Sequence, residues 1–268
     1  MGAGQAAGLL SELLDVAEEA ALAAGSLLRA RFEAGVETAL RTKTTPTDLV
    51  SEADLTAEAA IRAVLSRRRP DDAVLGEEGG HQGSQDGLLW VVDPLDGTLN
   101  FLHGIPVWCV SVAVRDGEGA LAGAILDPLR GELFSATRHG DARLGDAVLA
   151  GSSCEELAQA IVGTGFAYDA TVRAGQGEVV ARLLPRIGNL RRAGACALDL
   201  AWAAAGRLDA FYERGVQEWD VAAGELLCAR AGLMVERLPA ADGMPAGILA
   251  APAALAGDLR AVVSGAAA

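Results

Sequence analysis

The segment Trp90-Val-Val-Asp-Pro-Leu-Asp-Gly-Thr-Leu-Asn-Phe101 concentrates groups that could bind both a metal ion and a phosphate. Asp93 and Asp96 stand three residues apart at the end of an apolar run, and clustered oxygen ligands are what hard divalent cations need. Gly97 and Thr98 follow at once and offer backbone N–H groups to a phosphate. Asp-Pro and Asp-Gly are also turn dipeptides, so a tight turn without chemistry is the alternative. The combination of metal and phosphate ligands favours metal-assisted phosphoryl chemistry.

Further acids stand at predicted strand ends or helix starts in separated parts of the chain. Glu77 and Glu78 follow a short apolar strand and precede two glycines, although a solvated turn would explain them as well. Asp54 lies near the start of a predicted helix, and Asp220 lies in the first turn of another, where the helix dipole alone could favour an acid. Because ligands gather at the carboxyl ends of sheet strands, we interpret these acids as parts of one composite metal site.

The composition indicates a globular and strongly acidic protein. The chain has 268 residues, enough for one large domain or two closely packed halves, and 51% of them are apolar. The net charge of −14 disfavours binding to nucleic acids or to anionic membranes. A phosphate substrate that approaches such a protein needs local positive charge, which bound metal ions would supply.

The cysteines and the N-terminal residues favour a cytoplasmic protein. The cysteines are scattered and form no Cys-x-x-Cys pair, so we expect buried thiols in a reducing compartment and no structural zinc. They are Cys109, Cys154, Cys196 and Cys228. No basic region followed by an apolar core marks a secretory signal, and no apolar run reaches transmembrane length. We therefore expect no membrane partner.

The hydrophobic periodicity predicts an α+β first half and an α/β second half. Long helices are predicted over about 9–32 and 47–68, and strands over 73–76, 88–92, 107–115, 120–126 and 132–136. The segment 146–153, which contains Gly and Ser, is the best candidate boundary, so we divide the chain into 1–148 and 149–268. Strands and helices then alternate, with strands at 160–164, 189–192, 208–213, 233–238 and 248–250 and helices at 172–184, 195–205, 219–231 and from 252.

Four segments, in this order, resemble the inositol monophosphatase family of metal-dependent phosphatases. They are Pro46-Thr-Asp-Leu-Val-Ser-Glu-Ala-Asp54, Gly76-Glu-Glu78, Asp93-Pro-Leu-Asp-Gly-Thr98 and Trp219-Asp-Val-Ala-Ala223. The resemblance covers most of the chain and implies a layered αβαβα sandwich of the sugar-phosphatase type, with two intimately packed halves. It also implies a Mg²⁺-dependent, lithium-sensitive phosphatase that forms a homodimer.

The resemblance implies a role for each matching residue. Two Mg²⁺ ions would be held by Glu77, Asp93, the carbonyl of Leu95, Asp96 and Asp220, and a weaker third ion would rest on Glu77 and water. Asp54 and Thr98 would orient the attacking water, and Glu77 is counted with them as catalytic. The amides of Gly97 and Thr98 would hold the phosphate. Lys43, the only lysine in the chain, matches a lysine on a mobile loop near the metals.

The side of the site that would receive the leaving group is less closely determined. Glu213 matches a position that contacts substrate hydroxyls, which favours a polyol phosphate and inositol-1-phosphate first. Ala195 and Cys196 depart from the family pattern near this side, so histidinol phosphate is the main alternative, followed by fructose bisphosphate and nucleotide 3′-phosphates. A non-catalytic regulatory binding protein is the alternative of another class. Every expected acid is present, however, which favours an enzyme acting on a small phosphorylated substrate.

Overall fold

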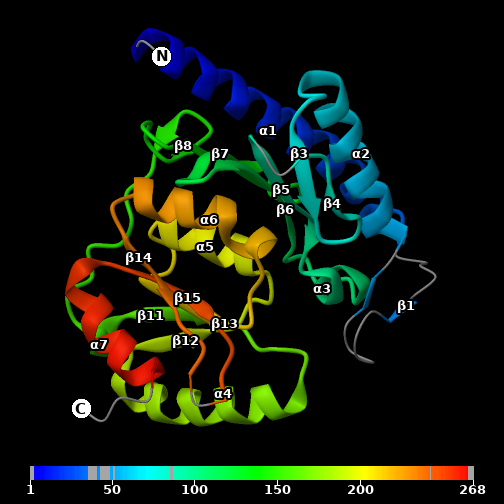
Figure 1. Ribbon diagram of the computed structural model, residues 1–268. Coiled ribbons are helices and arrows are strands. Elements are labelled where there is room, and N and C mark those ends of the chain that lie inside the picture. The colour runs from blue at the N-terminus through cyan, green and yellow to red at the C-terminus, as the bar shows by residue number, and fades with distance from the viewer. Residues whose placement is uncertain are drawn as a thin grey trace.

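Two β-sheets alternate with three pairs of helices in the computed structural model, which describes residues 3–35, 41–42, 49–50, 52–84, 87–241 and 243–264 (Figure 1). From one outer face to the other, the pairs are α1 (Ala3–Glu33) with α2 (Glu52–Arg68), α5 (Cys196–Ala204) with α6 (Glu218–Arg230), and α4 (Ala170–Leu183) with α7 (Ala253–Val263). This arrangement confirms the predicted αβαβα sandwich. No helix among the described residues is long and apolar enough to cross a membrane.

Apolar side chains at helical spacing hold α1 against the first sheet. Leu13, Ala17, Ala24 and Leu28 lie on the buried face, where small side chains let the helix approach closely. A Cβ atom on Gly25 would lie 2.5 Å from a methyl group of Leu126 in the sheet. Helix α1 begins earlier than the predicted residue 9. Helix α2 begins at Glu52, so the predicted helix over 47–68 is wrong at residues 49–50, which form a strand, and residues 47–48 lie outside the described residues.

The first sheet has eight strands in the order β10-β9-β8-β7-β6-β5-β3-β4, and only β3 and β5 run parallel. The strands are β3 (Ala73–Gly76), β4 (Gly80–Gln82), β5 (Leu89–Asp96), β6 (Cys109–Asp116), β7 (Gly119–Asp127), β8 (Glu132–Thr137), β9 (Arg143–Leu144) and β10 (Ala147–Val148). The two-residue strands β1 (Arg41–Thr42) and β2 (Leu49–Val50) pair with each other.

Strand β5 runs further than the predicted 88–92 and carries both aspartates of the opening motif. Its register with β6 shifts between Asp93 and Asp96, so the strand is bulged there. Pro94 lies within this bulge and has no N–H to donate to a neighbouring strand. Strand β5 is apolar before the bulge, and from the bulge onward it presents polar groups at its carboxyl end.

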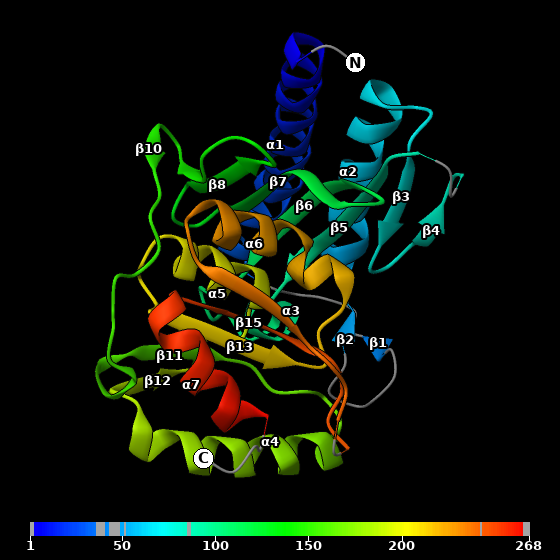
Figure 2. The ribbon, with the colours of Figure 1, turned by 60° about the vertical axis from the view of Figure 1, so that its left-hand side comes forward.

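The second sheet has five strands in the order β12-β11-β13-β15-β14. They are β11 (Ile161–Thr164), β12 (Asn189–Arg191), β13 (Ala210–Arg214), β14 (Met234–Leu238) and β15 (Gly247–Ala251). Strand β11 is parallel to both of its neighbours, while β15 is antiparallel to β13 and β14. Figure 2 shows this sheet between the helix pairs α5–α6 and α4–α7. The division at residues 148 and 149 stays a prediction.

Helices α5 and α6 pack between the two sheets because their contact faces are built from very small residues. A Cβ atom on Gly224 of α6 would lie 2.5 Å from Leu200 of α5, and one on Gly123 of β7 would lie 3.1 Å from Ala223. Glycine and alanine at these contacts allow the backbones to approach closely. The same close packing fixes the N-termini of both helices beside the end of β5.

Candidate active site

A pocket of about 430 Å³ opens at the carboxyl end of β5 and collects most of the predicted site residues. Those that line it are Glu77, Asp93, Leu95, Asp96, Gly97, Thr98, Cys196, Glu213 and Asp220. They come from both sheets and from the starts of α3 (Thr98–Leu102), α5 and α6. The fold therefore brings acids from two distant parts of the sequence, residues 77–96 and 213–220, to one cavity.

Asp96 joins the two halves of the site, because its carboxylate caps a helix of the other half. One of its oxygens accepts a hydrogen bond from the N–H of Cys196 (3.1 Å), and the other accepts one from the N–H of Ala197 (2.7 Å). The residue at the N-cap position of α5, Ala195, has no side chain that could do this. Burial raises the pKa of Asp96 to about 6, and the N–H groups of α5 oppose that rise.

Asp54 and Thr98 form a buried hydrogen-bonded pair beside β5. The hydroxyl of Thr98 donates to Asp54 Oδ1 (2.9 Å) and also lies 3.0 Å from the carbonyl oxygen of Leu95. Asp54 is fully buried in the first turn of α2, where the helix dipole favours a carboxylate. Sequence reasoning from the family resemblance paired these two residues as the groups that orient water, and the structure places them in direct contact.

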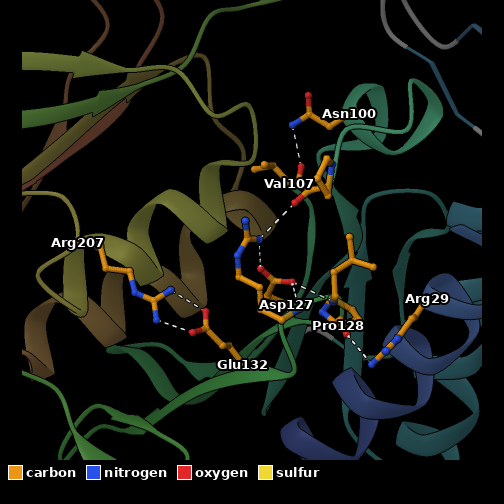
Figure 3. Close-up of polar contacts among 10 residues, drawn as sticks. Arg29, Asn100, Val107, Asp127, Pro128, Glu132 and Arg207 are labelled. Carbon is orange, nitrogen blue, oxygen red and sulfur yellow. Dashed lines mark hydrogen bonds and ion pairs between the residues drawn. The ribbon is translucent and has the colours of Figure 1, made fainter. Parts of the chain in front are cut away.

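Gly97 makes the turn from β5 into α3, and no other residue would fit there. Its φ of 93° lies in the left-handed region. A Cβ atom would also lie 3.0 Å from the carbonyl oxygen of Val107. The amide of Asn100 donates to the same carbonyl (2.8 Å; Figure 3). It also donates to the carbonyl of Ala193 (2.9 Å), which ties α3 to the segment before α5.

Glu58 of α2 holds the loop that carries Glu77. Its carboxylate is buried and accepts hydrogen bonds from the N–H groups of Glu78 (2.8 Å) and Gly79 (2.9 Å). Arg62, one turn further along α2, donates to the same carboxylate (2.7 Å). A Cβ atom on Gly79 would collide with Glu58, so the glycines beside Glu77 and Glu78 leave room for this carboxylate. The backbone of the Glu77 loop is thereby fixed by a buried ion pair.

Replacing Glu58 by glutamine is expected to lower the free energy of unfolding by about 2–4 kcal/mol, because it breaks a buried ion pair and one of the two N–H contacts. Urea denaturation measures the effect. Glu52→Gln is the matched control on the same helix, since the ion pair of Glu52 with Arg31 (3.1 Å) is largely solvated and contributes less than about 1 kcal/mol. An equal decrease in the free energy of unfolding in the two variants would contradict the role of Glu58 in holding the Glu77 loop.

Asp220 lies in the first turn of α6 and closes the pocket from the second half. One of its oxygens accepts a hydrogen bond from the N–H of Gln217 (2.6 Å), in a capping box that leaves the other oxygen for a ligand. The start of α6 is anchored further by an ion pair between Glu218 and Arg115 of β6 (2.6 Å). The position of Asp220 is therefore set by helix capping and by a contact with the first sheet.

The electrostatics of the pocket suit a divalent cation. Burial raises the pKa of Asp93 well above its usual range, and the negative charges of Glu77, Asp96 and Asp220 raise it further. Carboxylates that repel one another on shared pocket walls are the oxygen donors that Mg²⁺ prefers. In the described parts of the chain, no three His, Cys, Asp or Glu side chains form a ready-made metal site. The donor set fits Mg²⁺ in its chemistry.

Comparison with known proteins shows the family of this chain. The sequence pattern of the inositol monophosphatase family matches residues 9–264. The chain belongs to this family. It is 40% identical to an inositol-1-monophosphatase of Mycobacterium bovis, over 94% of this chain and 93% of that protein. It is 39% identical to the Nus factor SuhB of Escherichia coli, over 83% of this chain and 84% of that protein. The solved inositol monophosphatase of Anabaena superposes with a TM-score of 0.82 at 33% identity, covering 96% of both chains.

In this member of the inositol monophosphatase family, the second sheet supplies the other side of the pocket. Glu213, at the end of β13, lies directly over Gly165, where a side chain would collide with its carboxylate. Cys196 also lines the pocket. Ala195 was predicted beside it, but Ala195 is buried and is not among the residues that line the cavity. Lys43 lies outside the described residues.

Several further residues of the pocket wall were not among the predicted site residues, and four of them are aromatic or charged side chains from the second sheet. Phe166 and Tyr168 follow β11, and Arg192 and Arg214 follow or end strands of the same sheet. Their common signal is their position after the carboxyl end of a predicted parallel strand, which is where ligand sites form in α/β sheets. Arg214 is buried and donates to the carbonyls of Pro239 and Pro245, at 2.9 Å each.

Proposed function

We propose that this protein is a Mg²⁺-dependent phosphomonoesterase that hydrolyses a small polyol or sugar phosphate, with inositol-1-phosphate as the favoured substrate. The observation that carries the proposal is the convergence of the Asp54–Thr98 pair and the acids Glu77, Asp93, Asp96 and Asp220 at one pocket of the family fold. Glu77, Asp93, the carbonyl of Leu95, Asp96 and Asp220 would hold the ions. Mg²⁺, when bound, would neutralise the ligands, polarise the phosphoryl oxygens and lower the pKa of water.

The protein groups around the phosphate would then position the reactants. The Thr98 hydroxyl donates its hydrogen to Asp54, so its lone pairs are left to accept a hydrogen bond from the attacking water. Asp54 fixes the Thr98 rotamer from a fully buried position. The N–H groups of Gly97 and Thr98, at the start of α3, would donate to the phosphate oxygens. No cysteine or histidine nucleophile is needed in this scheme.

Glu213 would receive the leaving group. Its carboxylate lies on the wall supplied by the second sheet, beside Cys196, and burial raises its pKa to about 7, while the charge of Arg192 opposes that rise. A buried carboxyl group at this place would hydrogen-bond a hydroxyl of a polyol. Support for inositol over other polyols comes from the name of the Mycobacterium bovis relative.

Glu213→Gln is expected to change the ranking of substrates and to leave metal affinity unchanged. A lost charged hydrogen bond costs about 1.5–3 kcal/mol, or roughly ten- to a hundredfold in kcat/KM for the preferred polyol phosphate. Methyl phosphate, which is too small to reach Glu213 from the phosphate site, should be hydrolysed about as before. Steady-state kinetics on both esters check this expectation. Equal losses on both would show that Glu213 supports the metal site or the fold.

A phosphate-release screen tests the proposed function as a whole. The substrates are inositol-1-phosphate, histidinol phosphate, fructose 1,6-bisphosphate and a nucleoside 3′-phosphate, each with Mg²⁺ and with excess chelator. Turnover of inositol-1-phosphate that depends on Mg²⁺ is the expected result. If histidinol phosphate were the best substrate, the proposed reaction would stand and the proposed substrate would change. The proposal also includes a cytoplasmic homodimer, and sedimentation velocity tests the oligomeric state.

A regulatory binding role is the second candidate function, because the Escherichia coli relative is named a Nus factor. The two functions are separable by experiment. A folded protein that releases no phosphate from any ester of the screen, with Mg²⁺ present, would favour the regulatory role. Turnover of any of these esters at ordinary enzymatic rates would favour the phosphatase.

A further inference from the structure

Arg192 stands at the mouth of the pocket in the segment between β12 and α5. It is exposed and lines the cavity together with Phe166, Gly194 and Glu213. Its guanidinium carbon lies 5.9 Å from the centre of the Phe166 ring. Gly194 has a φ of 93°, and a Cβ atom at this position would collide with the Arg192 guanidinium. The guanidinium thus lies beside the Phe166 ring and close to the backbone of Gly194.

The charge of Arg192 acts on Glu213 and Asp199 only from a distance. Within the described residues, Arg192 makes neither a hydrogen bond nor an ion pair, whereas the other cation of the wall, Arg214, is buried and donates to two carbonyl groups. Most arginines of this acidic protein are paired, as Arg138 is with Asp116 (2.6 Å) and Arg130 with Asp127 (2.6 Å). A guanidinium without a hydrogen-bond partner at the mouth of the pocket is suited to binding an anionic group of a ligand.

The position of Arg192 determines which part of a substrate it could reach. Its neighbours Phe166 and Glu213 belong to the second sheet and the loops around it, on the side where the leaving group is proposed to bind. The groups proposed to hold the phosphate and the metals lie on the loop after β3, on β5, at the start of α3 and at the start of α6. A second negative charge on the leaving group would be repelled by Glu213, and Arg192 is the exposed cation placed to offset this repulsion.

We propose that Arg192 and Phe166 form a subsite for a second anionic group, a phosphate or a carboxylate, on the leaving group of the substrate. This inference rests on the proposed phosphatase function and extends it to esters with two anionic groups. The planar fork of arginine donates two parallel hydrogen bonds to either anion, and Phe166 orients the fork by stacking beside it. Gly194 leaves the guanidinium free to approach the backbone at the pocket mouth.

Matched substrate pairs test the subsite. Fructose 1,6-bisphosphate and fructose 1-phosphate differ by one phosphate, and 2-phosphoglycerate and glycerol 2-phosphate differ by one carboxylate. Arg192→Gln is expected to lower kcat/KM about tenfold for the ester with two anionic groups in at least one pair, and less than about twofold for its partner. Which pair responds tells whether the subsite takes a phosphate or a carboxylate. Arg192→Lys keeps the charge but lacks the planar fork, so its kcat/KM for the ester with two anionic groups should lie between those of the wild type and Arg192→Gln.

The control is Arg191→Gln, which removes the same charge from the neighbouring exposed residue. Arg191 donates to the carbonyl of Leu190 and does not line the pocket. Arg191→Gln should therefore change kcat/KM by the same factor for both esters of a pair. For the wild type, raising the ionic strength should also reduce kcat/KM more steeply for the ester with two anionic groups, and Arg192→Gln should remove this difference.

Two outcomes would overturn the subsite. Equal losses on both esters of each pair would mean that Arg192 only balances the charges of the pocket, and unchanged kinetics would mean that it has no role in binding. If the wild type hydrolyses no ester, the proposed function fails by itself. In that case calorimetric binding of the same esters in the presence of Ca²⁺ decides the subsite, because Arg192→Gln must then weaken the doubly anionic ligand selectively, by about tenfold in Kd.

Discussion

Asp93→Asn is expected to reduce phosphate release by at least about a thousandfold while the fold survives, a loss of about 4 kcal/mol in transition-state stabilisation. Asp93 would bridge two metal ions, and asparagine keeps its size and the contact with the N–H of Leu95 (3.0 Å) but removes the charge. Steady-state kinetics with saturating Mg²⁺ measure the loss. Near-normal activity of a folded variant would show that Asp93 is not a metal ligand.

The same substitution has an expected signature in stability that sets it apart from ordinary damage. Burial and the neighbouring acids raise the pKa of Asp93 in the folded chain above its unfolded value, so its ionisation destabilises the metal-free protein as the pH rises through the folded pKa. Asparagine carries no such charge. The metal-free variant should therefore melt no lower than the metal-free wild type at neutral pH, and it should gain less stability from added Mg²⁺.

Asp127→Asn is the matched control, because Asp127 is also a fully buried aspartate in the first sheet but lies outside the pocket. Its carboxylate pairs with Arg130 (2.6 Å) and accepts hydrogen bonds from the N–H groups of Leu129 and Arg130 (Figure 3). This variant should lose stability, by about 1–3 kcal/mol, and keep its turnover. Asp93→Asn should thus lose turnover and keep its stability, whereas Asp127→Asn should lose stability and keep its turnover. This difference distinguishes a metal ligand from a structural acid.

Removal of divalent cations is expected to stop phosphate release completely and reversibly. The pocket is lined by the acids Glu77, Asp93, Asp96, Glu213 and Asp220 against two arginines, so a phosphate dianion is repelled unless cations are bound. Dialysis against excess chelator followed by titration with Mg²⁺ measures loss and recovery. Chelator saturated beforehand with Mg²⁺ is the control and should have no effect. Undiminished turnover in excess chelator would exclude the metal-assisted mechanism.

The family and the layered fold were predictable from sequence because their signals are local or regular. Asp93, Asp96, Gly97 and Thr98 are neighbours in the chain, and the bulge of β5 only changes how they are presented. The alternation of strands and helices after residue 149 predicted the second sheet for the same reason. Nothing local links Asp220 to β5, and only the resemblance to a known family brought the two together before the structure did.

The residues that support the site were not predictable, because their partners are distant in sequence. Glu58 reads as an ordinary helix acid, yet it lies four residues after Asp54 on the buried face of α2, and a charged residue on an apolar face was an available signal. The need for Gly79 follows from the Glu58 carboxylate and cannot be seen in the loop itself. Arg192 has only its position after a predicted strand as a signal, and its neighbour Phe166 is 26 positions earlier in the chain.

The capping of α5 by Asp96 has a consequence for how relatives without activity should be recognised. A descendant that gave up hydrolysis and survived as a binding protein would still need this aspartate, because its loss would leave the amides of Cys196 and Ala197 without a partner and detach the two halves at that point. Selection for folding alone can therefore preserve the second aspartate of the motif. Asp93 makes no such bond to the other half in the described chain, so under its proposed metal role its retention, and not that of Asp96, would indicate that a lineage has kept its chemistry.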